Sequence, residues 1–484
     1  MSRRVYAPLL LFVLAISSCS WSTGRTESSK IVIEYWHQPR VRKIPGMEKE
    51  TPEYGDYERL LAEEFMRDNP NIEVKTQSLN WEDLPRKVPI SIMAGSPPDI
   101  LQDFSGRTSG YWYQGVLEPL DDVIADVMDD FQPGWIADNK IDGQLHAVPV
   151  FGGAQVLALN RAIWKKAGKL HLLPSPEDPT WTASEFETAL KAIAEPGRVY
   201  PLAIQASSEQ GDYGLLQFLW SKGAKIYDNQ DYSRVLLNSD DGVKALEWLV
   251  SAHKQGLLPP NVTSLSGGEL SDLFLRGGSA CVPAGADLET SLKIAKQEKR
   301  LRVEMDLMFA MPPTPKGEKP KVLSMTGGLV VFKQPDERKK QAVMRFVRFL
   351  STPKALQGYS IGGGITVGRK SVPNPSLKAR FGKVLGLIEE AESIDMGVMS
   401  PHYYAIRRLL PPQLQSAFLG QKTSKQALDA FCREAHTIIR QSEETRQRQA
   451  RGESRRSPPW LLTATLLLLF AAVAWVFRRQ LLAP

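Results

Sequence analysis

The chain has 484 residues, of which 42% are apolar and 24% are charged. This composition is ordinary for a globular protein and excludes wholesale disorder, and the length suffices for two lobes or domains that each bury a core. The formal net charge of +6 gathers at the chain ends, because residues 439–484 hold eight arginines against three glutamates and two more arginines precede residue 5. The near-neutral remainder lacks the basic surface that nucleic-acid binding requires, so we expect no nucleic-acid partner.

The N-terminus is predicted to be a secretory signal. Two arginines precede an apolar run over 7–16, and small residues follow up to Cys19. This order is typical of a signal peptide rather than of a membrane span. The four residues that end at Cys19 resemble the bacterial lipobox, which implies a lipid on Cys19. We therefore expect residues 1–19 to form a lipoprotein-type signal and the Ser/Thr-rich stretch 20–30 to be a tether.

Apolar periodicity then predicts alternating strands and helices. The first group comprises strands at 31–36, 72–76 and 99–103 with helices at 57–67 and 84–93. After Phe151 the second group comprises strands at 154–159 and 200–205 and helices at 182–194, 214–222 and 241–255. Such alternation favours a mostly parallel sheet covered by helices. Two α/β lobes in series are the simplest arrangement.

Short motifs spread along the chain carry a family resemblance. They are DNPNIEV (68–74), WEDL (81–84), MAGSPPDI (93–100), DGQLHAVP (142–149), LN (159–160), GLLPP (256–260), MPPTPKG (311–317) and GG (327–328). In this order they resemble the carbohydrate family of extracellular solute-binding proteins that includes maltose-binding protein. The resemblance covers roughly 30–440 and implies a type II periplasmic binding protein, in which two α/β lobes joined by hinge crossings close over a solute.

The resemblance also implies where the hinge and the lobes lie. Crossings are expected near 151–153, 283–285 and 327–328, where the broad φ range of glycine suits a bend, although these glycines can equally belong to ordinary turns. Lobe I is then expected over 30–151 and 286–327, and lobe II over 152–285 and 328–440.

Sugar recognition needs flat apolar faces for the pyranose ring and polar groups for its hydroxyls. Strands of this kind of sheet open a cleft at their carboxyl ends. On that rule the candidate solute contacts are Trp36, His37, Trp81, Asp103, Phe151, Glu209, Asp287 and Arg369. Trp112 and Trp220 are added as aromatic candidates.

Each aromatic candidate has a structural alternative. Trp81 either contacts solute or packs on the first turn of the helix after it. Trp36 ends an apolar strand and Trp220 sits near an amphipathic helix, so both also fit core positions. Trp112 belongs to a run of three aromatic residues that cannot all face one side of a helix, so one or two of them are core.

Each charged candidate also has a structural alternative. Asp103 either contacts solute or caps the following helix. Glu209 and Asp287 are either hydroxyl acceptors or solvated charges. Arg369 suits a phosphate or carboxylate group in bidentate fashion, or a structural ion pair.

The sequence holds no recognised catalytic motif. It lacks the phosphate-binding loop, the Gly-x-Ser-x-Gly elbow and the His-Glu-x-x-His pair, although a glycosidase needs only two carboxylates. No Cys/His pattern has zinc spacing, so we expect neither a metal nor a cofactor. Cys281 and Cys432 either form one disulfide or stay as buried thiols.

The C-terminal region predicts a second membrane attachment. Residues 460–477 form an uncharged apolar run. As a helix this run is about 27 Å long, enough to cross a hydrocarbon core. The basic linker 441–459 can touch anionic headgroups or be a solvated helix tail. More arginines precede the span than follow it, against the positive-inside tendency for an external body.

Together these features predict a non-enzymatic, membrane-anchored, extracytoplasmic solute-binding component of an ABC importer, located in the periplasm or at the cell surface. Its expected partners are a sugar or oligosaccharide, ABC permease subunits, and the membrane. The alternatives are a membrane-tethered sugar sensor or scaffold subunit, or a binder of glycerol phosphate or another polyol derivative.

Overall fold

The computed structural model describes residues 30–41, 53–80, 83–208, 211–228, 231–285, 288–362, 365–372 and 381–450. The predicted lipid site at Cys19, nearly all of the tether and the predicted span over 460–477 lie outside the described residues. Within the described residues, no helix is both long and apolar enough to cross a bilayer.

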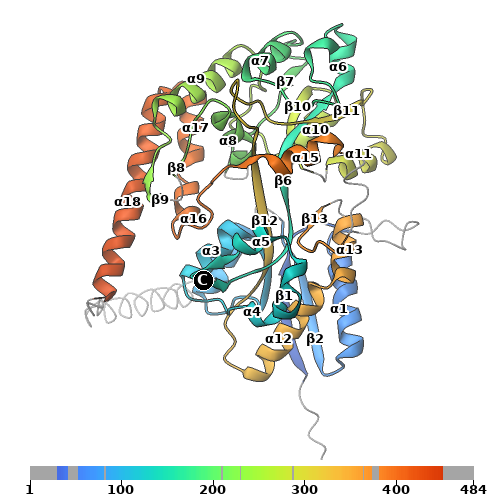
Figure 1. Cartoon of the computed structure of the whole chain (residues 1–484), viewed down its shortest axis with the longest axis vertical. Coiled ribbons are helices and arrows are strands. Elements are labelled where there is room, and N and C mark those ends of the chain that lie inside the picture. The colour runs from blue at the N-terminus through green and yellow to red at the C-terminus, as the bar shows by residue number, and fades with distance from the viewer. Residues whose placement is uncertain are drawn as a thin grey trace, which may run out of the picture.

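One ten-stranded sheet runs through the molecule from end to end (Figure 1). Its main path has the order β2-β1-β3-β12-β6-β10-β7, with β11 and β13 paired to β6 and β14 paired to β12. The strands are β1 (Ile31–His37), β2 (Ile72–Ser78), β3 (Ile100–Phe104), β6 (Val148–Asn160), β7 (Tyr200–Leu202), β10 (Ser279–Ala284), β11 (Leu307–Ala310), β12 (Lys321–Val331), β13 (Thr366–Val367) and β14 (Glu392–Ser393). Two short hairpins pair β4 (Lys140–Ile141) with β5 (Gln144–Leu145), and β8 (Tyr227–Asp228) with β9 (Asp231–Val235).

Helices cover both faces of this sheet. They are α1 (Asp56–Asp68), α2 (Leu84–Met93), α3 (Ser105–Tyr113), α4 (Asp121–Ile124), α5 (Pro133–Ala137), α6 (Arg161–Lys166), α7 (Ala183–Lys191), α8 (Asp212–Trp220), α9 (Asp240–Lys254), α10 (Gly267–Leu275), α11 (Leu288–Gln297), α12 (Glu337–Leu350), α13 (Pro353–Ile361), α15 (Lys383–Glu390), α16 (Tyr403–Arg407), α17 (Leu410–Phe418) and α18 (Ser424–Ala450). Every strand and helix predicted between residues 31 and 255 is present, with ends that move by a few residues, because apolar periodicity is a local property of the chain.

Lobe I, the lower half of Figure 1, is built around β2, β1 and β3. Ile33 and Tyr35 of β1 enter a core beneath α1, α12 and α13, where they meet Phe346. Leu101 of β3 joins a second core on the opposite face, with residues of α2 and α3. Successive side chains of a strand point to opposite faces. Burial on both faces therefore explains why these strands are nearly continuous apolar runs.

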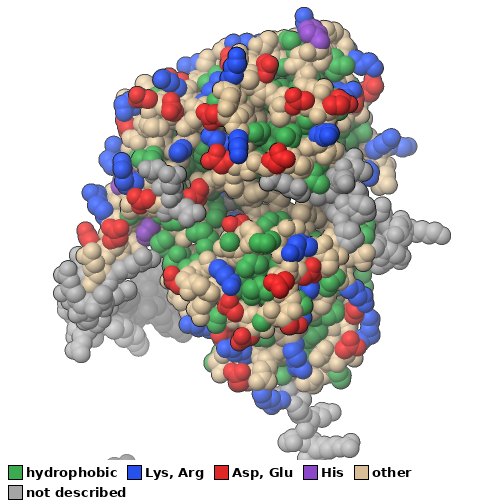
Figure 2. Space-filling model, viewed as in Figure 1, with side chains coloured by type: hydrophobic (Ala, Val, Ile, Leu, Met, Phe, Trp, Pro, Cys, Tyr) green, Lys and Arg blue, Asp and Glu red, His purple; other side chains and the backbone are tan. Residues whose placement is uncertain are grey.

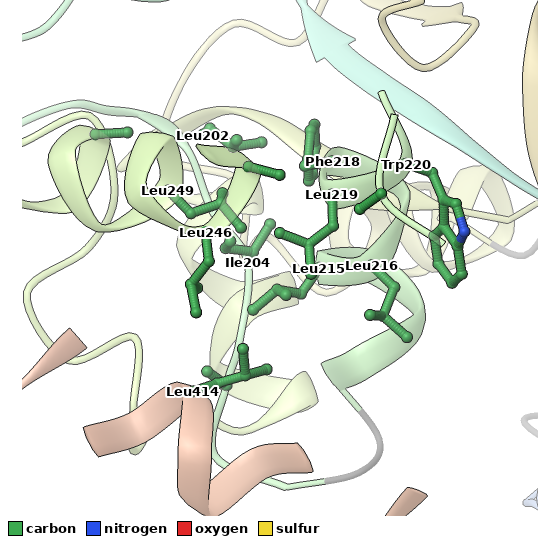
Figure 3. Packing of buried hydrophobic residues seen from close by; sticks show 14 of the residues in the cluster. Leu202, Ile204, Leu215, Leu216, Phe218, Leu219, Trp220, Leu246, Leu249 and Leu414 are labelled. Atoms are coloured by element: carbon green, nitrogen blue, oxygen red, sulfur yellow. The ribbon is translucent and has the colours of Figure 1, made fainter. Parts of the chain in front are cut away.

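Lobe II, the upper half of Figure 1, has the same layered arrangement. On one face Leu202 and Ile204 pack with residues of α8, α9 and α17, as Figure 3 shows. On the other face β6 and β10 pack against α10 and α15. Cys281 and Cys432 are buried in lobe II as free thiols, so of the two alternatives the structure has the reduced pair.

Two long antiparallel strands, β6 and β12, connect the lobes (Figure 1). Glycines gather where they cross, and Gly327 pairs with Phe151 at a shift in register. A Cβ atom on Gly327 would lie 2.0 Å from the Phe151 ring, and one on Gly152 would lie 2.7 Å from the carbonyl oxygen of Met325. Glycine is required at these positions because a neighbouring group occupies the space of a side chain.

The lobe boundaries differ from the expected ones in the second half of the chain. Residues 329–372 share the core of lobe I, and residues 156–323 share the cores of lobe II. The chain enters lobe II along β6, so its return along β12 must lead into lobe I rather than out of it. The expected crossing at 283–285 is the end of β10 inside lobe II, and the described residues from Phe381 to Ile439 contribute to the cores of lobe II.

The sheet is also mixed rather than mostly parallel. The pairs β1–β2, β1–β3 and β7–β10 are parallel, as the alternation of strands and helices predicts. The pairs that involve the crossing strands β6 and β12 with β3, β10 and each other are antiparallel. A strand that leaves a lobe runs against the strands of that lobe, which local periodicity does not reveal.

We predict that Gly327→Ala lowers the free energy of unfolding by about 1–3 kcal/mol, because the added methyl group overpacks against Phe151. The matched control is Gly386→Ala in α15, where a Cβ atom meets nothing within 4 Å. An exposed helical glycine favours alanine, so the control should gain about 0.5–1 kcal/mol. Urea denaturation of both variants measures the difference, and a neutral Gly327→Ala would show that the crossing is loosely packed.

Candidate functional site

The two lobes meet where α3 of lobe I lies against α16 of lobe II. Hydrogen bonds join the lobes here: Ser109 Oγ and the Tyr113 hydroxyl of α3 donate to the Val398 and Met399 carbonyls at 2.6 and 3.1 Å. The Tyr404 hydroxyl of α16 donates to the Pro85 carbonyl of α2 at 3.4 Å. The space-filling view shows a hollow between the two lobes (Figure 2). The contact between α3 and α16 joins the two lobes beside this hollow. The residues around that contact therefore form the candidate site.

Asp103 and Arg107 form the lobe I side of this contact. Asp103 is the second-last residue of β3, and Arg107 lies in the first turn of α3, so the guanidinium folds back on the carboxylate with Nε 2.9 Å from both oxygens. Gln38 and Tyr111 also donate to the Asp103 carboxylate, at 3.0 and 3.3 Å. Burial opposes the charge on Arg107, but Asp103 outweighs it and raises the pKa of the guanidinium. The Arg107 guanidinium therefore stays ionised although it is buried.

Tyr403 and Arg407 form the lobe II side. They are four residues apart on α16 and therefore share one face of the helix. A Cβ atom on Gly106 would lie 2.2 Å from the Tyr403 ring, so the ring of lobe II rests on the backbone of lobe I. The Arg407 guanidinium lies 5.8 Å from the centre of the Tyr403 ring and close enough to Arg107 to oppose its charge. The site thus brings an aromatic face and two guanidinium groups together.

Arg40 links this site to the crossing strands. Its guanidinium carbon lies 3.3 Å from the centre of the Phe151 ring and 5.1 Å from that of Phe104. It also donates to Gln38 Oε1 at 2.5 Å, and Gln38 in turn donates to Asp103. Contact is therefore continuous from the crossing at Phe151 to the charge pair of α3.

Lobe II contributes buried hydrogen-bond acceptors. Among the described residues, the side-chain carbonyl oxygens of Gln155, Gln205 and Gln217 are buried and have no hydrogen-bond partner. Gln205 follows β7 at its carboxyl end, and Gln155 lies two residues beyond the glycines of β6. A buried acceptor without a partner costs free energy, so such atoms are suited to a hydroxyl group or to water.

A pair of carboxylates also faces across the lobes. Asp138 follows α5 of lobe I, and Asp395 lies in lobe II between the core residues Ile394 and Met396. Burial raises the pKa of the Asp138 carboxyl to about 6, and the charge of Asp395 adds to the rise. Tyr232 of β9 lies beside the Asp395 carboxylate. Burial raises the pKa of the Tyr232 hydroxyl, and the charge of Asp395 raises it further.

The aromatic candidates from the sequence lie mostly in cores. Phe151 is 1% exposed and Trp220 is 6% exposed, and Figure 3 places Trp220 at the edge of the lobe II core. Trp36 and Trp112 are half-buried against the lobe I core, and the Trp112 ring lies 6.2 Å from that of His146. Trp81 lies outside the described residues. For Trp220 the structure shows the core alternative.

The charged and polar candidates are engaged in internal pairs. Arg369 is paired with Asp130 at 2.6 Å and donates to the Ser351 carbonyl, which is the ion-pair alternative. His37 is buried, with Nδ1 3.8 Å from a carboxylate oxygen of Glu58. Asp103 lies at the lobe contact but is bound to Arg107. Glu209 and Asp287 lie outside the described residues. Within the described part of the chain, no three acidic, histidine or cysteine side chains gather to hold a metal.

Arg107 and Arg407 were not among the sequence candidates. Arg107 follows Asp103 by four residues at a strand-to-helix junction, a spacing that favours an ion pair at the cleft edge. Tyr403 and Arg407 share the same spacing on a short helix. These local signals were available, but nothing local shows that α3 and α16, almost 300 residues apart, face each other.

We predict that Asp103→Asn destabilises the protein by about 3–5 kcal/mol, because it leaves Arg107 buried without its carboxylate. Adding Arg107→Met should recover part of the loss. The control is Asp83→Asn, which removes an exposed helical pair with Arg86 and should cost less than about 1 kcal/mol. Thermal unfolding of the variants measures the comparison, and equal losses for Asp83 and Asp103 would argue against a buried charge pair.

We predict that Asp138→Asn gains stability relative to the unmodified protein as the pH rises. Folding raises the pKa of Asp138 to about 6, so the folded protein holds this proton more tightly than the unfolded chain. The stability that this tighter proton binding contributes is fully present below about pH 4 and is lost as the pH rises through about 6. The difference in unfolding free energy should therefore grow across this window and be constant above about pH 7.

Chemical denaturation of both proteins at each pH measures that difference. The paired comparison is necessary because burial lowers the pKa of His146 to about 4, which removes stability as the pH falls through the same window. A flat difference would mean that Asp138 titrates normally.

Comparison with known proteins agrees with this geometry. The family model described as "Bacterial extracellular solute-binding protein" matches residues 49–357. The diacetylchitobiose binding protein DasA of Streptomyces coelicolor is 21% identical over 317 residues, which cover 66% of this chain and 71% of that protein. The sn-glycerol-3-phosphate-binding periplasmic protein UgpB of Shigella dysenteriae is 23% identical over 84% of this chain and 94% of its own.

Solved structures share the fold. A solute-binding protein of Thermotoga lettingae bound to α-D-tagatose superposes with a TM-score of 0.71 at 18% identity, over 85% of this chain and all of that chain. Maltose-bound MalE3 of T. maritima superposes with a TM-score of 0.69 at 18% identity, over 84% and 99% of the two chains. The fold is that of a type II periplasmic binding protein, a class of binding proteins rather than enzymes. This chain belongs to the family of bacterial extracellular solute-binding proteins.

Proposed function

We propose that the protein binds a sugar or oligosaccharide between its lobes and delivers it to the permease subunits of an ABC importer. The observation that carries this proposal is the Tyr403 ring of lobe II seated over Gly106 of lobe I. The ring is 3% exposed and packs in the lobe II core while the lobes are in contact, so it offers its apolar face to a pyranose only when α3 moves away from α16. A solute that enters there separates α3 from α16 and is then touched by both lobes.

Polar groups of lobe II and of the lobe contact suit hydroxyls. Gln205 and Gln217 carry buried acceptors without partners, and Arg107 and Arg407 supply donors from opposite lobes. Many modest contacts of this kind permit both capture and release. Trp36, Trp81, Glu209 and Asp287 stay as predicted additional contacts from the strand ends and loops.

A phosphate-bearing polyol is the second candidate solute. Two guanidinium groups approach each other at the lobe contact, and guanidinium forks bind phosphate in bidentate fashion. The similarity to an sn-glycerol-3-phosphate-binding protein supports the same class of ligand.

The proposed location is outside the cytoplasm, as the family implies, with attachment to the cytoplasmic membrane. The attachment would use a lipid on Cys19, the apolar segment 460–477, or both. A membrane-tethered sensor or scaffold subunit would use the same attachment and the same cleft without a permease, so loss of sugar uptake on deletion of the gene favours the importer.

We predict that Tyr403→Ala weakens sugar binding about tenfold or more, because the stacking face is lost. It should also lower the free energy of unfolding by about 3–5 kcal/mol, because the ring is buried in the lobe II core, so binding is measured under conditions in which the variant is folded. Isothermal titration with maltose, diacetylchitobiose, tagatose and sn-glycerol-3-phosphate identifies the solute and measures the effect. The control is Leu419→Ala, an exposed apolar side chain of lobe II away from α16. Binding of glycerol phosphate alone would favour the second candidate, and an unchanged affinity in Tyr403→Ala would place the site elsewhere.

A further inference from the structure

The carboxyl ends of β7 and β10 lie at the edge of lobe II that faces lobe I. β6 runs from lobe I into lobe II, and β10 is antiparallel to it, so β10 runs back toward lobe I. β7 is parallel to β10 and shares this direction. The helix α10 packs on β10 and is joined to it by the short turn 276–278, so α10 begins at the same edge. Gln205 after β7 and Gly267 at the start of α10 therefore both lie at the edge that faces lobe I.

Gln205 carries a buried polar atom that no described residue binds. The side chain is 7% exposed, and its Oε1 atom is buried without a hydrogen-bond partner among the described residues. Gly211 packs against the stem of this side chain, because a Cβ atom on Gly211 would lie 2.3 Å from Gln205 Cγ. A buried acceptor without a partner costs free energy, which a ligand with a matching donor recovers.

The start of α10 lies next to this acceptor. A Cβ atom on Gly267 would lie 3.5 Å from Gln205 Oε1, so the absent side chain leaves space beside the oxygen. Gly267 is the first residue of the helix, and its N–H therefore has no acceptor within the helix. A hydroxyl group is both a donor and an acceptor. A hydroxyl placed here can donate to Gln205 Oε1 and accept from the helix end.

Hydrogen bonds fix the segments around this space. Ser207 Oγ donates to the Leu265 carbonyl at 2.7 Å, which joins the loop after β7 to the loop before α10. The N–H of Ala206 donates to the Val262 carbonyl at 2.8 Å. Gln415 Nε2 of α17 donates to the Ala206 and Ser207 carbonyls at 2.9 and 3.0 Å. A site held in this way loses little conformational entropy when it binds a ligand.

The charge at this helix end favours an uncharged group. Ser266 and Glu269 form a capping box, in which the Glu269 carboxylate accepts from the Ser266 N–H at 2.8 Å and from its hydroxyl at 2.7 Å. These hydrogen bonds hold the pKa of the Glu269 carboxyl below its ordinary value, so the group is negative at neutral pH. This charge already interacts favourably with the helix dipole, and it repels a second anion. A sugar hydroxyl therefore suits this place better than a phosphate or a carboxylate.

We propose that Gln205 and Gly267 form a hydroxyl-binding subsite of lobe II, which takes an uncharged hydroxyl of the solute. The inference rests on the proposed function, in which a sugar binds between the lobes. It defines the solute more closely, because the part that reaches this edge of lobe II is an uncharged polyol. Any phosphate of the solute lies elsewhere in the cleft.

Two pairs of variants test the subsite by isothermal titration of the full, detergent-solubilised chain. The probe is whichever of maltose, diacetylchitobiose and tagatose the unmodified chain binds. Gln205→Leu removes the acceptor, and Gly267→Ala puts a methyl group into the space, so each should weaken binding about tenfold or more. The controls are Gln255→Leu, an exposed glutamine after α9, and Gly268→Ala, where a Cβ atom meets no described atom within 4 Å. Both controls should leave the affinity unchanged.

Melting temperatures without sugar separate a binding role from a structural one. Gln205→Leu removes an acceptor that is unpaired in the folded protein, and Gly267→Ala replaces a glycine of a helix, so neither should lower the melting temperature. Gln205→Glu tests the charge of the ligand. It keeps an acceptor for a hydroxyl and should weaken sugar binding less than Gln205→Leu, whereas an anionic group at this place would be repelled.

The outcomes separate the subsite from the proposed function. If the unmodified chain binds none of the three sugars, the proposed function is wrong and the subsite is wrong with it. If a sugar binds equally well to Gln205→Leu and Gly267→Ala, or binding is lost together with a lower melting temperature, the proposed function stands and the subsite is refuted. A larger loss of affinity in Gln205→Glu than in Gln205→Leu refutes the uncharged hydroxyl.

Discussion

The antiparallel pairing of β6 with β12 at their glycines is the constraint on which the rest of the structure depends. It holds two layered lobes in one sheet while leaving little side-chain bulk at the crossing. Phe151 occupies the space over Gly327, and the Arg40 guanidinium stacks on the Phe151 ring. Arg40 also donates a hydrogen bond to Gln38, which donates one to Asp103. The crossing and the lobe contact are therefore parts of one packed unit. A movement of β6 against β12 at the crossing would displace α3.

The candidate site is an interface rather than a preformed pocket of one lobe. Each lobe offers a guanidinium group, while the carboxylate comes from lobe I and the aromatic ring over Gly106 comes from lobe II. Such a division suits a binding protein, because neither lobe alone makes all the contacts and bound solute favours the closed arrangement. The buried glutamine carbonyls of lobe II agree with the proposed sugar, whose hydroxyls would supply the donors that these acceptors lack.

The sequence candidates illustrate what a strand-end rule can and cannot find. It selected Asp103, whose buried carboxylate is paired with Arg107, and a solute contact by Asp103 stays a prediction. It also selected Arg369, which forms an ion pair with Asp130, while Trp220, chosen as an aromatic residue near a helix, belongs to the lobe II core. A tryptophan or arginine near a strand end has the same local sequence in either role. Only the partner decides between them, and here the partner of Arg369 lies 239 residues away.

The sequence by itself determined the order of strands and helices up to residue 255, the two-lobed class and the family, because periodicity and short motifs are local. The tertiary structure decided which lobe receives residues 328–372, the antiparallel direction of the crossing strands, and the approach of α16 to α3. These depend on contacts between segments hundreds of residues apart. Their free energy comes from packing and hydrogen bonds that no local stretch of the chain encodes.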